Sequence, residues 1–445
     1  MRIKFKLDLL PQSDGDILMD FSPAIDVVNG VQTNYCIEND VVKAYREDVN
    51  YTEKYIVVSP TDANIADGEK PSLIAKYTKF IVQDRPNSSW TERPRPVLLF
   101  GTRTGNAVTL ASANHTMQVE SGNGVTIVYN LIPNETYHWT ESNTNLQGSF
   151  TTTGQTRMIK IPLFNFRDIG GWPCYDDNGN VTGRIKYGLC YRGMCWARTK
   201  KEDGTYKGGS WTCFEHRLYP EVTEQLMELG VTDDIDLRGW KKGNQAKSED
   251  DYSKGAHAVD PIYPTIDGRK ITYNQGEIPA YSFVTQITNY FTYNYNAATD
   301  TAPTRYAYQN LIAHLEIVAE TGRVPYVHCA TGADRTGVFF ATLMALLGCS
   351  INDIAKEYEY TTFNGGGQRV NLGYIEGGKA MGKPDSNIRT FLTAFGTSGL
   401  AENTLGRTTV NRIVAWVRGL YLRDHTEAQW TEFLTRLKAK MVEAV

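Results

Sequence analysis

The segment HCATGADRTG, residues 328–337, has the residue types and spacing in this chain that could most directly do chemistry. Cys329 stands six positions before Arg335, and the backbone between them can turn its N–H groups inward around the oxygens of a phosphate. The arginine would close this cradle with a planar guanidinium that is always charged. The cysteine would then face phosphorus as a nucleophile. The spacing therefore predicts a site for a phosphate monoester.

The flanks of this segment predict the elements that would position it. Residues 324–328, VPYVH, have the β-branched and aromatic composition of a short buried strand. Residues 336–347 form an apolar run that predicts a buried helix, ended by Gly348. The loop would thus join a strand end to a helix N-terminus, where unpaired N–H groups favour anions and the thiolate form of a cysteine. Gly332 would allow a positive φ and a close approach of the ligand.

The simplest alternative is that Cys329 is an ordinary buried cysteine and Arg335 a surface charge, because a cysteine and an arginine at this spacing also occur by chance. The preceding histidine, the glycine at position 332, the following Thr-Gly and the predicted strand and helix argue against it. We therefore adopt the phosphate-binding interpretation.

These residues resemble the cysteine-dependent protein tyrosine phosphatases, and most closely the bacterial and fungal tyrosine phosphatase family whose loop reads HCxxGxDRTG. Residues 165–171 (NFRDIGG) with 183–192 are similar to the opening segment of that family. Residues 234–238 (DIDLR) are similar to its second strand, and residues 354–360 to the helix that follows its loop. The resemblance covers about residues 155–425.

The resemblance implies a two-step phosphatase reaction through a cysteinyl-phosphate, with neither metal nor cofactor. It makes Asp334 the candidate for the acid that protonates the leaving group, while Asp300 and Asp260 stay open as alternatives. The expected catalytic residues are Cys329, Arg335 and Asp334; the expected substrate-binding residues are Ala330, Thr331, Gly332, Ala333, Thr336 and Gly337; and the expected supporting residues are His328, Asp236, Arg238, Arg167 and Asp300. For Asp236, Arg238 and Arg167, an ordinary salt bridge is an equally good interpretation.

Two departures from the family pattern bear on the substrate. Many members carry a lysine just before the loop aspartate, a feature associated with phosphoinositides, whereas this chain has Ala333. Gly193 replaces the usual serine after Arg192. The expected function is therefore a protein tyrosine phosphatase, or a hydrolase of another small phosphomonoester. An inositol phosphate or phosphoinositide phosphatase is the first alternative, and an inactive phosphate-binding module is the second.

Composition limits the other possibilities. The 445 residues suggest two or three domains, and the net charge of -4 gives no reason to expect nucleic acid as a partner. The seven cysteines contain no Cys-x-x-Cys pair, so we expect reduced cysteines and no zinc site. We expect neither a signal peptide nor a transmembrane segment in this chain. A cytoplasmic location is then the default, and an extracytoplasmic one follows if a signal has been removed.

The first part of the chain predicts an all-β fold. Residues 97–101, 116–120 and 125–129 alternate apolar and polar side chains between turns rich in Gly, Asn and Ser. Residues 131–139 and 148–154 resemble the end of a fibronectin type III-like sandwich, in which Tyr137 would anchor a corner and lie in the core with Trp139. A binding surface for protein or carbohydrate on this sandwich stays open as the minority interpretation.

The chain is therefore expected to be multidomain. Residues 1–50 have an unclear fold, residues 51–155 form the fibronectin type III-like β-sandwich, and residues 156–445 form the phosphatase domain. In the last part predicted strands alternate with helices, which indicates a central, mainly parallel sheet flanked by helices. Asp236 and His328 would both lie at strand ends and could converge on one cleft, where such sheets bind ligands.

Overall fold

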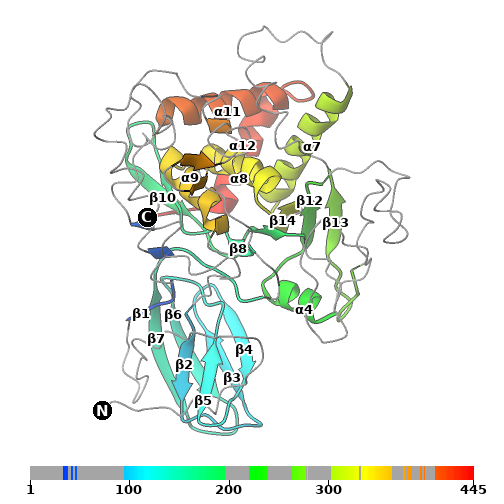
Figure 1. Ribbon diagram of the computed structural model, residues 1–445. Coiled ribbons are helices and arrows are strands. Elements are labelled where there is room, and N and C mark those ends of the chain that lie inside the picture. Colours follow the sequence, from blue (N-terminus) through cyan, green and yellow to red (C-terminus); the bar gives the residue numbers. More distant parts are fainter. Residues whose placement is uncertain are drawn as a thin grey trace.

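The computed structural model describes residues 34–38, 42, 43, 46, 47, 95–161, 163, 165–195, 220–238, 263–276, 278, 302–329, 332–362, 374–376, 379–381, 391, 392, 395 and 406–445. These residues form a β-rich N-terminal part and a larger C-terminal part that contains the helices, as the sequence predicts, and the two lie end to end (Figure 1). Ala330, Thr331, Asp260 and Asp300 lie outside the described residues.

Two sheets form the N-terminal part. One is five-stranded, in the order β1 (Asn34–Cys36), β7 (Gln147–Thr153), β6 (Thr136–Glu141), β3 (Ala107–Ala111) and β4 (Thr116–Glu120); the other pairs β2 (Val97–Phe100) with β5 (Val125–Val128). Side chains along β6 are alternately exposed and buried, because successive residues of a strand point to opposite faces. Strand β1, from the segment whose fold the sequence leaves unclear, pairs in parallel with β7.

Tyr137 and Trp139 are both buried in the core between these strands, as the sequence predicts. The amide of Ile132 donates a hydrogen bond to the Tyr137 hydroxyl oxygen over 3.0 Å, and the Tyr137 ring stacks on Phe150 at 5.8 Å between centroids. The tyrosine therefore ties the turn before β6 to the core.

The central sheet of the C-terminal part has five strands, in the order β13 (Thr272–Gln275), β12 (Asp233–Asp236), β14 (Pro325–Cys329), β11 (Tyr191–Met194) and β8 (Arg167–Asp168). Strands β13, β12, β14 and β11 run parallel, and β8 pairs antiparallel with β11 at the edge. Strand β14, which ends at Cys329, is thus central, and its neighbours on both sides point the same way.

Helices cover both faces of this sheet (Figure 1). Val327 and Cys329 pack into the core formed by α7 (Ala302–Ala319), α8 (Asp334–Leu347), α9 (Ile351–Glu359), α11 (Arg407–Tyr421) and α12 (Glu427–Met441). Tyr326 packs into the opposite core, against α4 (Pro220–Glu228). The two-residue period of β14 therefore sends Cys329 and His328 to opposite faces. In the described part of the chain, no helix has the length and apolar character needed to span a membrane.

Smaller elements complete the C-terminal part. A three-stranded sheet joins β9 (Pro173–Tyr175), β10 (Val181–Ile185) and β17 (Val442–Ala444), so the last strand of the chain returns to the first third of this part. Strands β15 (Tyr374–Glu376) and β16 (Lys379–Met381) form a hairpin-like pair, and a 3-10 turn (Tyr360–Thr362) follows α9.

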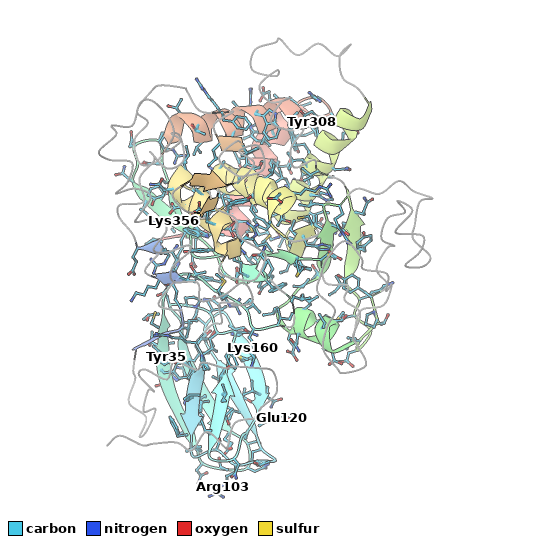
Figure 2. All side chains as sticks on the ribbon, in the orientation of Figure 1. Tyr35, Arg103, Glu120, Lys160, Tyr308 and Lys356 are labelled. Atoms are coloured by element: carbon cyan, nitrogen blue, oxygen red, sulfur yellow. The ribbon has the colours of Figure 1, made fainter. Side chains whose placement is uncertain are left out.

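Hydrogen bonds connect the two parts. The buried Arg157 donates to the carbonyl oxygens of Leu131 and Asn130, at 3.2 and 2.6 Å, and forms an ion pair with Asp168 at 2.8 Å. Lys160, at the junction in Figure 2, donates its amide to Asn130 Oδ1 at 2.7 Å. Helix α9 also takes part, since Lys356 Nζ donates to the carbonyl oxygen of Arg46 at 2.7 Å (Figure 2).

Candidate active site

Cys329 lies at the C-terminal end of the central strand, and helix α8 begins five residues later at Asp334. The Cys329 side chain is only 5% exposed, and its carbonyl oxygen accepts a hydrogen bond from the Cys195 amide at 2.9 Å, which extends the pairing of β11 with β14. The structure thus has the strand and the helix that the sequence predicts on the two sides of this segment. Ala330 and Thr331, two of the predicted phosphate-binding residues, are outside the described part.

The loop reaches its helix through a glycine that no other residue could replace without strain. Gly332 has a φ of +66°, and a Cβ atom there would lie 2.0 Å from the carbonyl oxygen of Gly193. The loop therefore packs directly on the backbone at the end of β11, and the positive φ predicted for Gly332 is confirmed. Gly193 is itself confined, because a Cβ there would lie 3.1 Å from the Phe166 ring.

Helix α8 begins two residues before the predicted start at Thr336, because the helical turn already includes Asp334 and Arg335. Both side chains are partly exposed, whereas Ala333 and Thr336 are fully buried. Ala333 caps the helix without a side-chain hydrogen bond, so the first amides of α8 have no side-chain cap from it. Such an N-terminus carries partial positive charge, and it lies at the carboxyl end of β14, where an anion would be stabilised.

Thr336 places a hydroxyl group inside this region. Its Oγ1 is buried and has no hydrogen-bond partner among the described residues. A buried hydroxyl without a hydrogen-bond partner destabilises a fold by an amount on the order of 1–3 kcal/mol, unless a ligand or another group forms a hydrogen bond with it. Thr336, predicted to bind substrate, thus has a buried hydroxyl in the first turn of α8.

Gly337 has a packing role. A Cβ atom at this position would lie 2.5 Å from the ring of Tyr358, and the Gly337 amide donates to the Ala333 carbonyl oxygen at 2.7 Å. That amide is engaged inside the helix, and the substrate-binding role predicted for Gly337 stays a prediction. The glycine lets α9 approach α8.

Asp334 accepts a hydrogen bond from the Tyr358 hydroxyl at 2.9 Å through Oδ1. The candidate acid is therefore held by the helix that follows α8. Asp300 and Asp260, the alternatives for this role, lie outside the described residues, so no geometry distinguishes them.

A buried polar network holds the loop from behind. Arg192 Nη2 donates to the carbonyl oxygen of Gly332 at 2.7 Å, and Asn165 Nδ2 donates to the same oxygen at 3.0 Å. Glu357 of α9 forms ion pairs with Arg167 Nε at 2.7 Å and with Arg192 Nη1. Arg167, predicted as a supporting residue, thus lies in an ion pair behind the loop.

His328 faces the other side of the sheet, where two aspartates of β12 surround it. Its Nε2 lies 2.7 Å from Asp234 Oδ1, and its Nδ1 lies 3.9 Å from Asp236 Oδ1. Burial alone would lower the pKa of His328, but the two carboxylates outweigh it and raise the pKa to about 9. The histidine therefore lies in β14 itself as a buried, charged group on the face opposite Cys329, and its predicted supporting role stays a prediction.

Asp236 and Arg238 form a salt bridge at the end of β12. Arg238 Nη2 lies 2.6 Å from Asp236 Oδ2, and the Arg238 backbone amide donates to Asp236 Oδ1 at 2.9 Å. Burial opposes ionisation of Asp236, but Arg238 and His328 outweigh it and hold the pKa of the carboxyl below its ordinary value. Asp236 is also the register partner of His328, so the two strand ends lie side by side, and the predicted shared cleft stays a prediction.

Four residues of this site have no predicted role: Asn165, Arg192, Glu357 and Tyr358. Arg192 could have been found, because an arginine between Tyr191 and Met194 in a buried strand requires a buried counter-charge. The identity of that counter-charge could not, since Glu357 lies 165 positions away in the chain. In the described ranges, no group of three or more His, Cys, Asp or Glu side chains could hold a metal ion.

A comparison with models of known protein families found a match, which covers this part of the chain. Residues 212–394 match the model of the tyrosine phosphatase family, and this range includes the loop and helices α8 and α9. The match supports a phosphatase domain there, although it spans less than half of the 445 residues and begins after residues 165–192. No curated protein matches the chain.

Proposed function

We propose that this protein hydrolyses phosphomonoesters, with phosphotyrosine in proteins as its substrate, through a cysteinyl-phosphate intermediate. The observation that carries the proposal is the position of Cys329 at the end of the central parallel strand, six residues before Arg335 in the first turn of α8. Carboxyl ends of parallel strands and helix N-termini are the places where folds of this kind bind phosphate. The family match over residues 212–394 supports a phosphatase reaction.

The reaction has two displacements at phosphorus. In the first, the Cys329 thiolate forms an S–P bond while the bond between phosphorus and the ester oxygen breaks. The leaving oxygen takes the electron pair and a proton from the acid. In the second, water attacks phosphorus and gives a proton to the carboxylate that the first step left, the S–P bond breaks with its electron pair on sulfur, and inorganic phosphate leaves the regenerated thiolate.

Arg335 and the loop stabilise the charge that moves in these steps. The Arg335 guanidinium would bind two of the three equatorial phosphate oxygens, and the amides at the N-terminus of α8 would bind the remaining charge. Ala330, Thr331, Gly332 and Ala333 are the residues whose amides we assign to this cradle. The buried Thr336 hydroxyl has its hydrogen available for the thiolate that departs in the second step.

Asp334 is the acid that we propose, because it stands in the first turn of α8 next to Arg335. Protonation matters for a phenolic leaving group such as tyrosine, which is poorly expelled as an anion. Asp300 and Asp260 are the competing assignments.

Phosphotyrosine is favoured over polyphosphorylated inositols because the loop carries no cation beyond Arg335. Position 333, where the family frequently has lysine, is an alanine that is fully buried. A second phosphate would find no added positive charge from this residue. An inactive phosphate-binding protein would have no chemical need for the Cys329 thiol beside Arg335.

The test is a substrate panel in the presence of a chelator. Phosphotyrosine peptide, phosphoserine peptide, inositol phosphates and p-nitrophenyl phosphate are compared for wild type and Cys329→Ser. We expect turnover of p-nitrophenyl phosphate and phosphotyrosine peptide without divalent metal, and a loss on the order of 10⁴-fold or more in the variant. Activity that requires magnesium, or that survives in Cys329→Ser, would contradict the proposal.

A further inference from the structure

Two separate arms of hydrogen bonds meet at the Gly332 carbonyl oxygen, and both start from one carboxylate. The first runs from Glu357 through Arg192, whose Nη2 donates to Gly332 at 2.7 Å. The second runs from Glu357 through Arg167 to Asn165, whose Nδ2 donates to the same oxygen at 3.0 Å. Glu357 comes from α9, the helix after α8, whereas Asn165, Arg167 and Arg192 come from a part of the chain well before the loop.

We propose that Glu357 is a positioning residue for the phosphate loop, an inference that rests on the proposed function. It acts through Arg192, Arg167 and Asn165, and it fixes Gly332 at the positive φ that the loop needs. With Gly332 held, the backbone that leads into α8, with its amide donors, keeps its position before substrate arrives. Preorganised donors of this kind cost no rearrangement when charge develops on the phosphate.

Burial of the network means that few other side chains could replace Glu357. The side chains of Arg167, Arg192 and Glu357 are 1%, 0% and 3% exposed, so neither guanidinium can exchange its carboxylate for water. Each carboxylate oxygen holds one arginine. The Glu357 carbonyl oxygen also accepts from Arg167 Nη2 at 2.8 Å, which fixes the orientation of that guanidinium. A side chain with only one acceptor oxygen could serve one arm and would leave the other without its anchor.

The net charge of the network allows a positioning role of Glu357 to be distinguished from a role that depends on its charge alone. Two guanidinium groups and one carboxylate leave one positive charge in excess behind the loop. Glu357→Gln would increase that excess. If only charge mattered, the variant would bind phosphate more tightly. If Glu357 positions the loop, the variant binds phosphate more weakly, because the amide presents one oxygen and turns donor hydrogens toward the second arginine.

The experiment measures inorganic phosphate affinity by calorimetry, and kcat and KM for p-nitrophenyl phosphate, in wild type, Glu357→Gln and Glu357→Asp. Misplacement of reacting groups by about 1 Å costs about 10²-fold, and we expect a loss of this size in kcat/KM for Glu357→Gln, with weaker phosphate binding. Glu357→Asp keeps the charge but shortens the reach by one methylene. It should fold more readily, and its loss should be intermediate, with phosphate binding again weakened.

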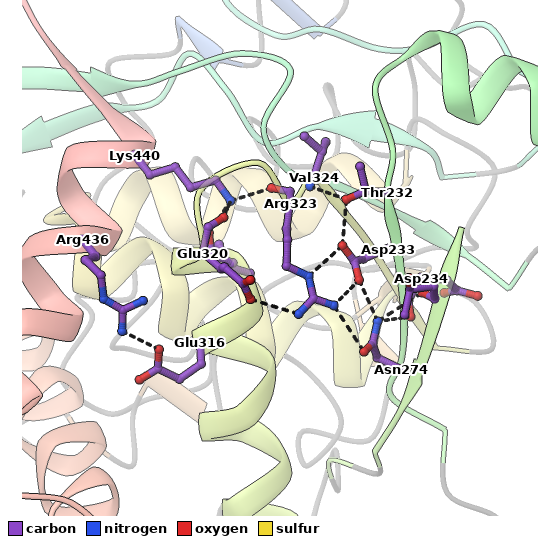
Figure 3. A network of polar contacts seen from close by, with 12 residues as sticks. Thr232, Asp233, Asp234, Asn274, Glu316, Glu320, Arg323, Val324, Arg436 and Lys440 are labelled. Atoms are coloured by element: carbon purple, nitrogen blue, oxygen red, sulfur yellow. Dashed lines mark hydrogen bonds and ion pairs between the residues drawn. The ribbon is translucent and has the colours of Figure 1, made fainter. Parts of the chain in front are cut away.

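Asp233→Asn is the matched control. Asp233 is also nearly buried and holds an arginine, Arg323, by an ion pair, but it lies at the opposite end of β12 from the site (Figure 3). Its substitution should reduce thermal stability to a similar degree. It should leave phosphate affinity and KM close to wild type, because no arm leads from it to the loop.

The outcomes distinguish failure of the proposed phosphatase function from failure of the positioning role of Glu357. A wild type that neither binds phosphate nor turns over substrate would overturn the proposed function, and this inference with it. A wild type that turns over substrate, with Glu357→Gln binding phosphate as tightly as wild type or more tightly, would overturn the positioning role alone. Equal losses of phosphate affinity in Glu357→Gln and Asp233→Asn would also overturn it, since they would reflect general destabilisation.

Discussion

Tyr358 donates its hydroxyl to Asp334 at 2.9 Å, and its ring lies where a side chain at position 337 would have to go. The tyrosine therefore joins α9 to the first turn of α8, and Asp334 is held by one carboxyl oxygen. The assignment of Asp334 as the acid is testable through the leaving group.

Asp334→Asn should slow phosphotyrosine hydrolysis strongly and p-nitrophenyl phosphate hydrolysis much less. The physical reason is that p-nitrophenolate leaves without a proton, whereas the tyrosine phenolate does not. The measurement is kcat/KM for both substrates against pH, where the alkaline limb should flatten in the variant. Asp300→Asn is the control and should be nearly silent; a leaving-group-dependent loss in Asp300→Asn, with none in Asp334→Asn, would transfer the role to Asp300.

Arg335→Lys should lose kcat heavily although the charge is kept. Lysine offers a point charge, and it cannot bind two phosphate oxygens in the plane that a guanidinium provides. Steady-state kinetics with p-nitrophenyl phosphate give the comparison, and circular dichroism confirms that the variant is folded. Kinetics near wild type would mean that Arg335 lies outside the cradle.

Thr336→Val should reduce turnover without reducing stability. Valine has nearly the shape of threonine, and the buried Oγ1 that it removes has no partner among the described residues, so its loss should not cost folding free energy. If the hydroxyl stabilises the departing thiolate, breakdown of the cysteinyl-phosphate becomes slower. Rapid-mixing experiments should then show a burst of p-nitrophenol followed by a slower steady state. A fall in thermal midpoint with unchanged kinetics would assign Thr336 to packing alone.

His328 should make stability depend on pH between neutral and alkaline conditions. Its pKa is raised from 6.5 to about 9, so the stabilisation by the charged form is complete below about 6.5 and is lost as the pH rises through about 9. A shift of this size corresponds to roughly 3 kcal/mol, at about 1.36 kcal/mol per pKa unit. Urea unfolding at pH 6 and pH 9.5 should show this decrease in wild type. His328→Gln should lose most of it, and a variant with the same pH dependence as wild type would contradict the assignment.

Local patterns allowed the strand and helix around the loop to be predicted. The strand-forming residues before Cys329 and the apolar residues before Gly348 each stand next to one another in the sequence. Such runs indicate a buried strand and a buried helix without reference to the rest of the chain. The start of α8 was missed by two residues because Asp334 and Arg335 are polar and add nothing to an apolar pattern. Asp236 and His328 were expected at strand ends, and they are register partners there, whereas the cleft expected between them stays a prediction.

The network behind the loop could not be predicted in the same way. Glu357 and Tyr358 stand next to each other in an amphipathic helix, where a glutamate usually faces solvent. Their partners, Arg192 and Asp334, lie 165 and 24 positions away in the chain. Only the packing of α9 on α8 shows that the glutamate faces inward. A role that depends on contacts over such separations is visible in the three-dimensional arrangement and not in residue spacing.

The most direct measurement of the central claim is capture of the covalent intermediate. Wild-type protein is mixed with a phosphotyrosine peptide, the reaction is quenched in acid within the first turnover, and the digested protein is analysed by mass spectrometry. The account predicts a phosphate adduct on the peptide that contains Cys329, absent from Cys329→Ser and enriched in Thr336→Val. Turnover without any adduct on Cys329, or an adduct on a different residue, would contradict it.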